Sequence, residues 1–106
     1  MIFDNLKTFV DLYEKYITRK TNTQQQKMFD ITLINMYILG KNGKSVITEN
    51  DLNDIQGLSK IDLFKSLKEA EQRELIKDIS SHQGRRWILM QDGIKYTEAL
   101  LEQIQK

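Results

Sequence analysis

The chain of 106 residues contains no cysteine and no proline, and its one histidine is His82. Without cysteine there is no thiolate nucleophile, no disulfide and no thiolate ligand for zinc, and one histidine does not make an ordinary zinc site. We therefore expect no metal and no cofactor. The composition is compatible with a reducing compartment.

Long apolar segments are also missing. No apolar run exceeds five residues, which is too short for a helix that crosses a bilayer, and Met1-Ile2-Phe3-Asp4 lacks the basic stretch and apolar core of a signal peptide. We expect a cytoplasmic protein with no membrane partner.

The motifs of common enzyme classes are absent as well. The sequence shows no carboxylate pair and no nucleophile with a base, and the segment Gly40-Lys41-Asn42-Gly43-Lys44-Ser45 lacks the spacing and the following helix of a phosphate-binding loop. We therefore predict that the protein is not an enzyme.

The composition favours one compact helical domain over residues 1–106, because 40% of the residues are apolar, 29% are charged and glycine is scarce. The formal net charge of +1 argues against a general polyanion binder. Basic residues are nevertheless clustered. The clusters are Lys41 with Lys44, the set Lys60, Lys65 and Lys68, and Arg85 with Arg86.

Two hydroxyl residues each stand three positions before an acid. Thr48 precedes Asp51, and Ser59 precedes Asp62. Each hydroxyl can accept a hydrogen bond from a backbone N–H that the first helical turn leaves unpaired, so each pair predicts the start of a helix.

The two capped helices are expected over about 49–56 and 60–73, with Gly57 at the tight turn between them. Two short helices that cross in this way form a helix-turn-helix, which presents its second helix to the major groove of DNA. A projection of this second helix at 100° per residue separates an apolar side from a polar side that faces away from the core. The predicted apolar side carries Leu63, Phe64, Leu67 and Ala70, and the opposite side carries Asp62, Lys65, Glu69 and Gln72.

A hairpin is predicted after the second capped helix, over about 75–90. Leu75, Ile76 and Ile79 indicate one strand, residues 80–84 form a tip without apolar side chains, and residues 86–90 return as a second strand. Arg85 and Arg86 follow the tip, where an arginine has the reach and the fork geometry to hold phosphate. Trp87 alternates with Arg86 and is expected to pack beneath the hairpin against the preceding helix.

Three further helices surround these elements. Apolar spacing predicts an amphipathic helix over 2–18, a buried central helix over 24–39 that ends near Gly40 and Gly43, and a last amphipathic helix after Gly93. A short strand over 45–47 leads into Thr48. Because one small core does not cover both terminal apolar faces, we expect a homodimer. Its predicted interface comprises Phe3, Leu6, Phe9, Val10, Tyr13, Ile17, Leu100, Leu101 and Ile104.

The segment Leu58 to Ile76 resembles the recognition helix and the following turn of the multiple-antibiotic-resistance regulator (MarR) family and related small winged-helix repressors. Gly84-Arg85-Arg86 stands where that family carries a basic wing, and Leu89 to Gly93 keeps its Leu-x-x-x-Gly spacing. The resemblance covers about half of the chain. It implies a dimeric transcription factor whose recognition helix enters the major groove. Departures include Glu74 in place of the usual glycine before the wing.

Together these features predict a mainly α fold with a small β-hairpin (α+β), arranged as a winged helix-turn-helix. The expected function is sequence-specific binding of double-stranded DNA as a homodimer, acting as a transcriptional repressor. Two alternatives stay open: a centromere-binding adaptor of a plasmid or phage partition system, and a winged-helix module that docks another protein. The residues expected to contact DNA are Ser59, Lys60, Ile61, Asp62, Lys65, Lys68, Arg85 and Arg86.

Overall fold

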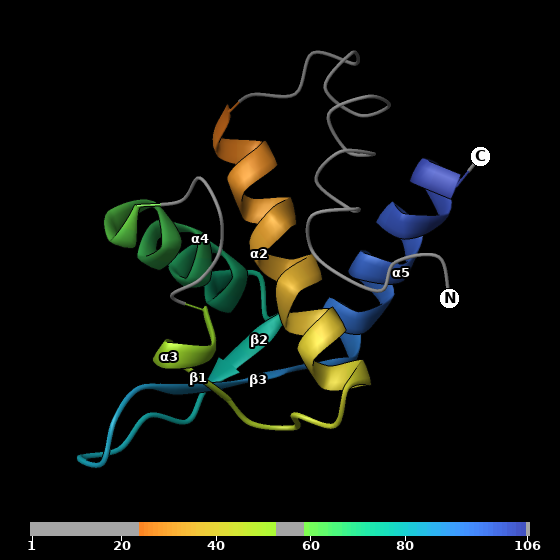
Figure 1. The fold of residues 1–106 in the computed structure, drawn as a ribbon. Helices are drawn as coiled ribbons and strands as arrows, with labels where there is room; N and C mark the ends of the chain where they lie inside the picture. Colours follow the sequence, from red (N-terminus) through yellow and green to blue (C-terminus); the bar gives the residue numbers. More distant parts are fainter. Residues whose placement is uncertain (1–23, 53–58, 106) are drawn as a thin grey trace.

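The computed structural model describes residues 24–52 and 59–105, and these residues form helices around a small antiparallel sheet. This confirms the mainly helical α+β class. In chain order the elements are α2 (Gln24–Lys41), β1 (Ile47–Thr48), α3 (Glu49–Leu52), α4 (Lys60–Gln72), β2 (Ile76–Asp78), β3 (Arg86–Leu89) and α5 (Gln91–Gln105), as Figure 1 shows. No helix in the described ranges is both long enough and apolar enough to span a bilayer.

Helix α2 is the centre of the molecule, as its apolar residues on nearly every side predict. It contacts both α4 and α5, which lie on either side of it in Figure 1. Phe29, Leu33, Ile34 and Met36 are fully buried. The other helices therefore take their positions from α2.

Gly43 ends α2 with a backbone φ of 99°, a conformation that side chains disfavour. The N–H of Lys44 donates to the carbonyl of Leu39, and the N–H of Gly43 donates to that of Gly40. This pair of bonds is the Schellman motif, which satisfies the last carbonyls of a helix. The helix runs to Lys41, two residues beyond the predicted end.

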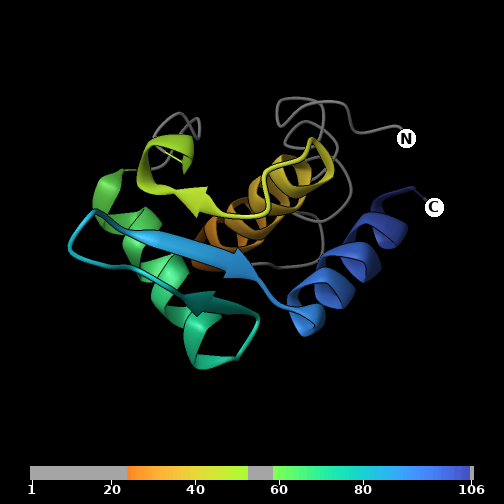
Figure 2. The ribbon, with the colours of Figure 1, turned by 90° about the horizontal axis from the view of Figure 1, so that it is seen from below.

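Strand β3 lies between β1 and β2, and both pairings are antiparallel (Figure 2). Trp87 of β3 is opposite Ile47 on one side and Asp78 on the other. Trp87 is only 3% exposed, so the predicted burial beneath the hairpin is confirmed. The first strand covers Ile47–Thr48, so it starts two residues later and ends one residue later than expected, and Val46 is exposed.

Helix α5 begins at Gln91, before the predicted start after Gly93, so Gly93 lies inside its first turn. The hydroxyl of Tyr96 donates to the carboxylate of buried Asp30 at 2.6 Å, which ties α5 to α2. Burial, followed by this hydrogen bond, raises the pKa of Tyr96 above its ordinary value of 10.0. The hydroxyl therefore remains a donor over the whole physiological range.

The predicted dimer residues fall into two groups. Leu100 and Leu101 are 9% and 5% exposed and belong to the core of a single chain, which leaves them little surface to offer a second subunit. The other residues lie outside the described side chains; they are Phe3, Leu6, Phe9, Val10, Tyr13, Ile17 and Ile104.

Candidate nucleic-acid interface

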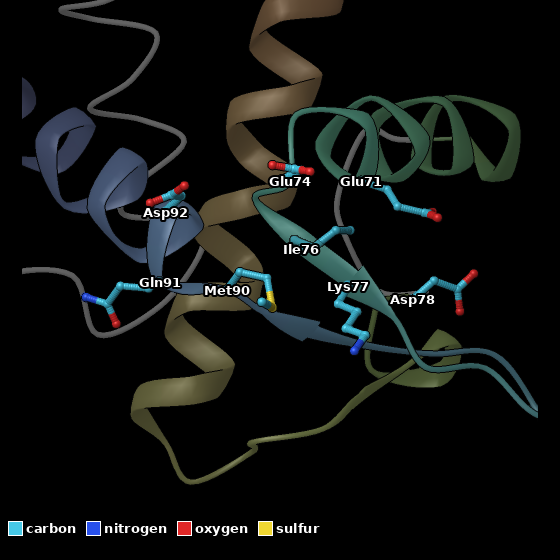
Figure 3. Close-up of a pocket in the computed structure, with 8 residues that line it drawn as sticks. All are labelled: Glu71, Glu74, Ile76, Lys77, Asp78, Met90, Gln91 and Asp92. Atoms are coloured by element: carbon cyan, nitrogen blue, oxygen red, sulfur yellow. The ribbon is translucent and has the colours of Figure 1, made fainter.

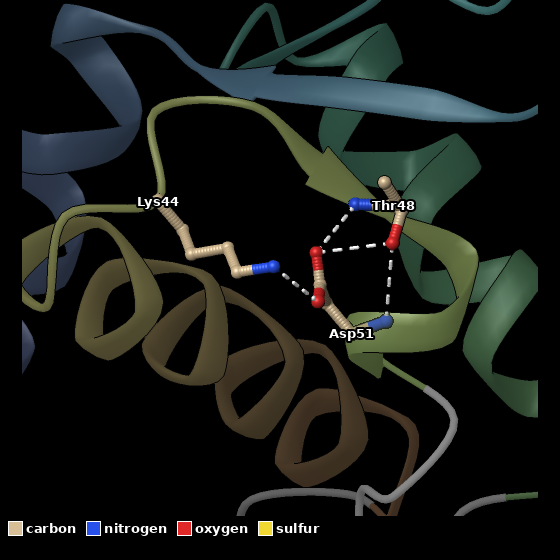
Figure 4. Close-up of polar contacts among 3 residues, drawn as sticks. All are labelled: Lys44, Thr48 and Asp51. Carbon is tan, nitrogen blue, oxygen red and sulfur yellow. Dashed lines mark hydrogen bonds and ion pairs between the residues drawn. The ribbon is translucent and has the colours of Figure 1, made fainter.

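The start of α3 is held by a reciprocal pair of hydrogen bonds between Thr48 and Asp51 (Figure 4). The N–H of Asp51 donates to the Thr48 hydroxyl at 3.3 Å, and the N–H of Thr48 donates to the Asp51 carboxylate at 2.9 Å. The ammonium of Lys44 also donates to this carboxylate at 3.0 Å. These contacts, that of the Thr48 N–H foremost, lower the pKa of Asp51. The predicted cap is confirmed.

The start of α4 is capped by Ser59, whose hydroxyl accepts from the N–H of Asp62 at 3.1 Å. This confirms the second predicted cap. Lys60 follows on the surface, and its ammonium lies 3.4 Å from the carboxylate of Glu49 in α3. Ser59 and Lys60 are therefore exposed residues that also fix the beginning of α4.

The outward side of α4 differs from the one predicted. Ile61 is 70% exposed, and the residues that share its side of the helix, at steps of about three and four, are Lys65, Lys68 and Gln72, all exposed. Asp62 and Glu69, expected to face away, are only partly exposed. The outward side therefore carries two lysines, and exposed Glu71, three positions after Lys68, lies at its edge.

The cause of this rotation lies on the opposite side of α4. Ser66 is 5% exposed and packs with Leu63, Leu67 and Ala70, whereas Phe64 is only partly buried. Exchanging Phe64 for Ser66 in the buried set turns the inward direction by about 40° at 100° per residue. Because serine is small, it can be buried where α4 packs closely. The hydrophobicity of the sequence alone therefore predicts an inward direction that differs from the observed one.

Phe64 lies at the edge of α4 that contacts the hairpin. Its ring centroid is 6.4 Å from that of Trp87, and the guanidinium of Arg85 lies 4.7 Å from the centre of the Phe64 ring. This is the geometry of a cation–π interaction. Arg85 is thus docked on α4 instead of extending beyond the hairpin.

Arg86 lies on the other face of the sheet. It is paired with Thr48 in β1 and is partly buried, while its neighbour Trp87 points into the core. Successive residues of a strand point to opposite faces. The two arginines predicted to act together are therefore separated, and Arg85 alone joins the lysines of α4.

The hairpin tip is closed by backbone hydrogen bonds in both directions between Ser81 and Gly84, each 3.0 Å long. The N–H of Arg86 donates to the Ser80 hydroxyl at 2.9 Å, and the N–H of Ser80 donates to the carboxylate of Asp78 at 2.7 Å. The bonds from Ser80 hold the pKa of Asp78 below its ordinary value. The tip is thereby fixed relative to the strands.

A hollow of about 330 Å³ separates α4 from the hairpin. Phe64 and Trp87 contribute its apolar wall, and Lys68 and Arg85 are the cations among its lining residues. Glu71 and Asp78 line it as well and mark the point where the charge changes sign.

Beyond that point the surface is acidic. A second hollow, of about 480 Å³, lies along the edge strand β2 between the end of α4 and the start of α5 (Figure 3). Its charged residues are Glu71, Glu74, Asp78, Asp92 and Lys77. Within the described ranges no three carboxylates or histidines are arranged to hold a metal ion. This face would repel a polyanion.

Sequence reasoning missed two residues of the candidate interface. The sequence predicts Gln72 on the outward side without assigning it a contact, and it predicts Phe64 on the apolar side of the helix. The residues next to Phe64 in the sequence do not show that it contacts the hairpin, because the direction of its side chain depends on where the hairpin returns to α4.

Searches of protein-family models, of curated proteins and of solved structures find no match to this chain.

Proposed function

We propose that the chain is a winged helix-turn-helix protein that binds double-stranded DNA through α4 and the hairpin. One observation carries the proposal: Lys65 and Lys68 are exposed on the outward side of α4, and the hairpin adds Arg85 to the same surface. In this fold α3 supports α4 from behind, α4 enters the major groove and the hairpin contacts the adjacent backbone.

The outward residues of α4 suit the reading of base edges. A lysine such as Lys65 donates to the acceptors of guanine, Gln72 can pair with adenine, and Ile61 can pack on the methyl group of thymine. Lys68 and Arg85 line the same hollow, where a phosphate of the DNA backbone can approach both cations. Asp62 and Lys60 lie at the start of the helix, where Lys60 is partly neutralised by Glu49.

The proposed biological role is transcriptional regulation, as a repressor that acts as a homodimer. A dimer places two recognition helices on successive turns of the duplex, about 34 Å apart. A centromere-binding adaptor of a partition system would use the same surface on repeated sites. Measuring the mass in solution by light scattering tests the dimer, and a monomer at micromolar concentration would contradict the model with two half-sites.

One observation favours a different function, the docking of another protein. Ile61 is 70% exposed in the first turn of α4, on its outward side, and an apolar side chain there also suits a protein partner. Salt separates the two functions, because release of counterions makes DNA binding weaken steeply with salt, whereas apolar contacts do not weaken in this way.

The direct test of the DNA-binding surface is Lys65→Ala, with Lys95→Ala as the matched control. Both lysines are exposed on helices, but Lys95 lies on α5, away from α4. We expect Lys65→Ala to reduce discrimination at one base pair by about 1–3 kcal/mol and Lys95→Ala to change nothing. Equal behaviour of the two variants would show that α4 is not the reading element.

A further inference from the structure

The contact between Arg85 and Phe64 joins two elements that are distant in sequence. The guanidinium of Arg85 lies 4.7 Å from the centre of the Phe64 ring, and Phe64 is itself held against Trp87 of β3. The hairpin and α4 therefore meet through contacts from Trp87 to Phe64 and from Phe64 to Arg85, and the arginine is exposed.

The donors of Arg85 are available to an external acceptor. Among the described residues it forms no ion pair within 4.0 Å, and the carboxylate of Asp78, which lines the same hollow, accepts a hydrogen bond from Ser80. The attraction of a guanidinium to a ring face uses none of its five N–H donors as hydrogen bonds to the ring edge, so a phosphate can still accept from them.

We propose that Phe64 is a positioning residue for DNA binding, which holds Arg85 as a ready-made phosphate clamp on the hairpin side of α4. The proposal rests on the proposed function. An arginine side chain loses conformational freedom when it binds phosphate, and an arginine already held on a ring has less left to lose. The ring thus raises affinity without touching DNA itself.

This assignment separates the roles of two residues by their salt dependence. Arg85→Ala removes a phosphate contact, so affinity falls by about tenfold and the log–log salt slope becomes shallower by about 0.9. Phe64→Leu keeps an apolar side chain and leaves Arg85 in place. Phe64→Leu lowers the affinity for DNA by about two- to tenfold, because Arg85 is no longer held on the ring before DNA binds. It leaves the salt slope unchanged.

The experiment measures affinity for double-stranded DNA at several salt concentrations for the wild type, Phe64→Leu, Arg85→Ala and the double variant. Phe64→Tyr serves as the conservative variant, since it keeps the ring and its hydroxyl can reach water at this partly exposed position. Thermal unfolding of each variant confirms that the fold is intact. We expect Phe64→Leu to have no effect in the Arg85→Ala background and Phe64→Tyr to bind like the wild type.

Two results would overturn the positioning role while leaving DNA binding in place. One is additive losses from Phe64→Leu and Arg85→Ala, and the other is an Arg85→Ala variant that binds as tightly as the wild type. A loss in folded Phe64→Tyr equal to that in Phe64→Leu would also overturn it. If the wild type itself shows no salt-dependent binding, the proposed function fails.

Discussion

Glu74 has a backbone φ of 60°, which is the left-handed region that non-glycine residues rarely occupy. It follows the end of α4, where the N–H of Leu75 donates to the carbonyl of Ala70 and the N–H of Glu74 donates to that of Glu71. This is a second Schellman motif, whose special position normally holds glycine. The turn from α4 into β2 therefore stores backbone strain at one residue.

Replacing Glu74 by glycine should stabilise the protein. Relief of the left-handed strain outweighs the added freedom of the unfolded chain, and we expect the free energy of unfolding to rise by about 0.5–1 kcal/mol. Chemical denaturation measures the change. The matched control is Glu71→Gly, inside α4, which should lower the same quantity by about 1 kcal/mol. A destabilised Glu74→Gly variant would contradict this account of the turn.

Gly93 is required for a different reason, close packing. A Cβ atom at this position would overlap the carbonyl oxygen of Leu75 and lie 2.8 Å from Cδ1 of Leu89. The same carbonyl accepts from the N–H of Met90 at 2.9 Å, so it cannot move freely. The first turn of α5 thus lies directly on the segment that joins α4 to β2.

We expect Gly93→Ala to lower the free energy of unfolding by about 2–3 kcal/mol through overpacking. Gly40→Ala is the control, because a Cβ at Gly40 meets nothing within 4 Å. At that helical site alanine should stabilise by about 0.5–1 kcal/mol. If both alanine variants unfold at the same denaturant concentration, the close contact of α5 is not real.

At the scale of elements, the cap of α3 couples stability to pH. The hydrogen bonds from Thr48 and Lys44 lower the pKa of Asp51 from 3.8, so the carboxylate contributes stability above that pH. This contribution is lost as pH falls through the lowered value, where the folded protein takes up the proton.

Asp51→Asn should therefore lower the free energy of unfolding by about 0.5–1.5 kcal/mol near neutral pH. The difference from the wild type should shrink as pH falls below 3.8. Thermal unfolding measured from neutral to acidic pH gives the stability difference between the two proteins and its change with pH. A difference that is independent of pH would mean that the charge of Asp51 plays no part in the cap.

The sequence predicts elements better than it predicts their orientation. The caps at Thr48 and Ser59 depend on residues three positions apart, so they are visible locally and both are confirmed. Whether Phe64 faces the core or the hairpin depends on contacts with Trp87, which lies beyond β2 and the hairpin tip in the sequence. Local periodicity does not contain that information.

Arg85 and Arg86 illustrate the same limit in the hairpin. The sequence places both beside the tip, but only the strand register decides which face each one takes. In α5, Leu100 and Leu101 have the apolar spacing of an interface, and the structure places them in the core of one chain. Spacing identifies a buried face without identifying what covers it.

The formal net charge of the whole chain is only +1, but basic and acidic side chains gather on different parts of the described surface. Lys65 and Lys68 lie on the outward side of α4, and Arg85 joins them from the hairpin. The edge of β2 carries the opposite sign, in the hollow between Glu74 and Asp92. A polyanion can therefore approach the described surface favourably from the side of α4, and this orients the proposed complex.

DNA binding by the wild-type protein can be measured as its affinity for double-stranded DNA by fluorescence anisotropy over a range of salt concentrations. If Lys65, Lys68 and Arg85 contact the duplex, the logarithm of the association constant should fall linearly with the logarithm of salt, with a slope of about −2 or steeper per chain. Lys65→Ala should make the preference for one sequence weaker. Undetectable binding at low salt, or a slope near zero, would contradict the DNA-binding account.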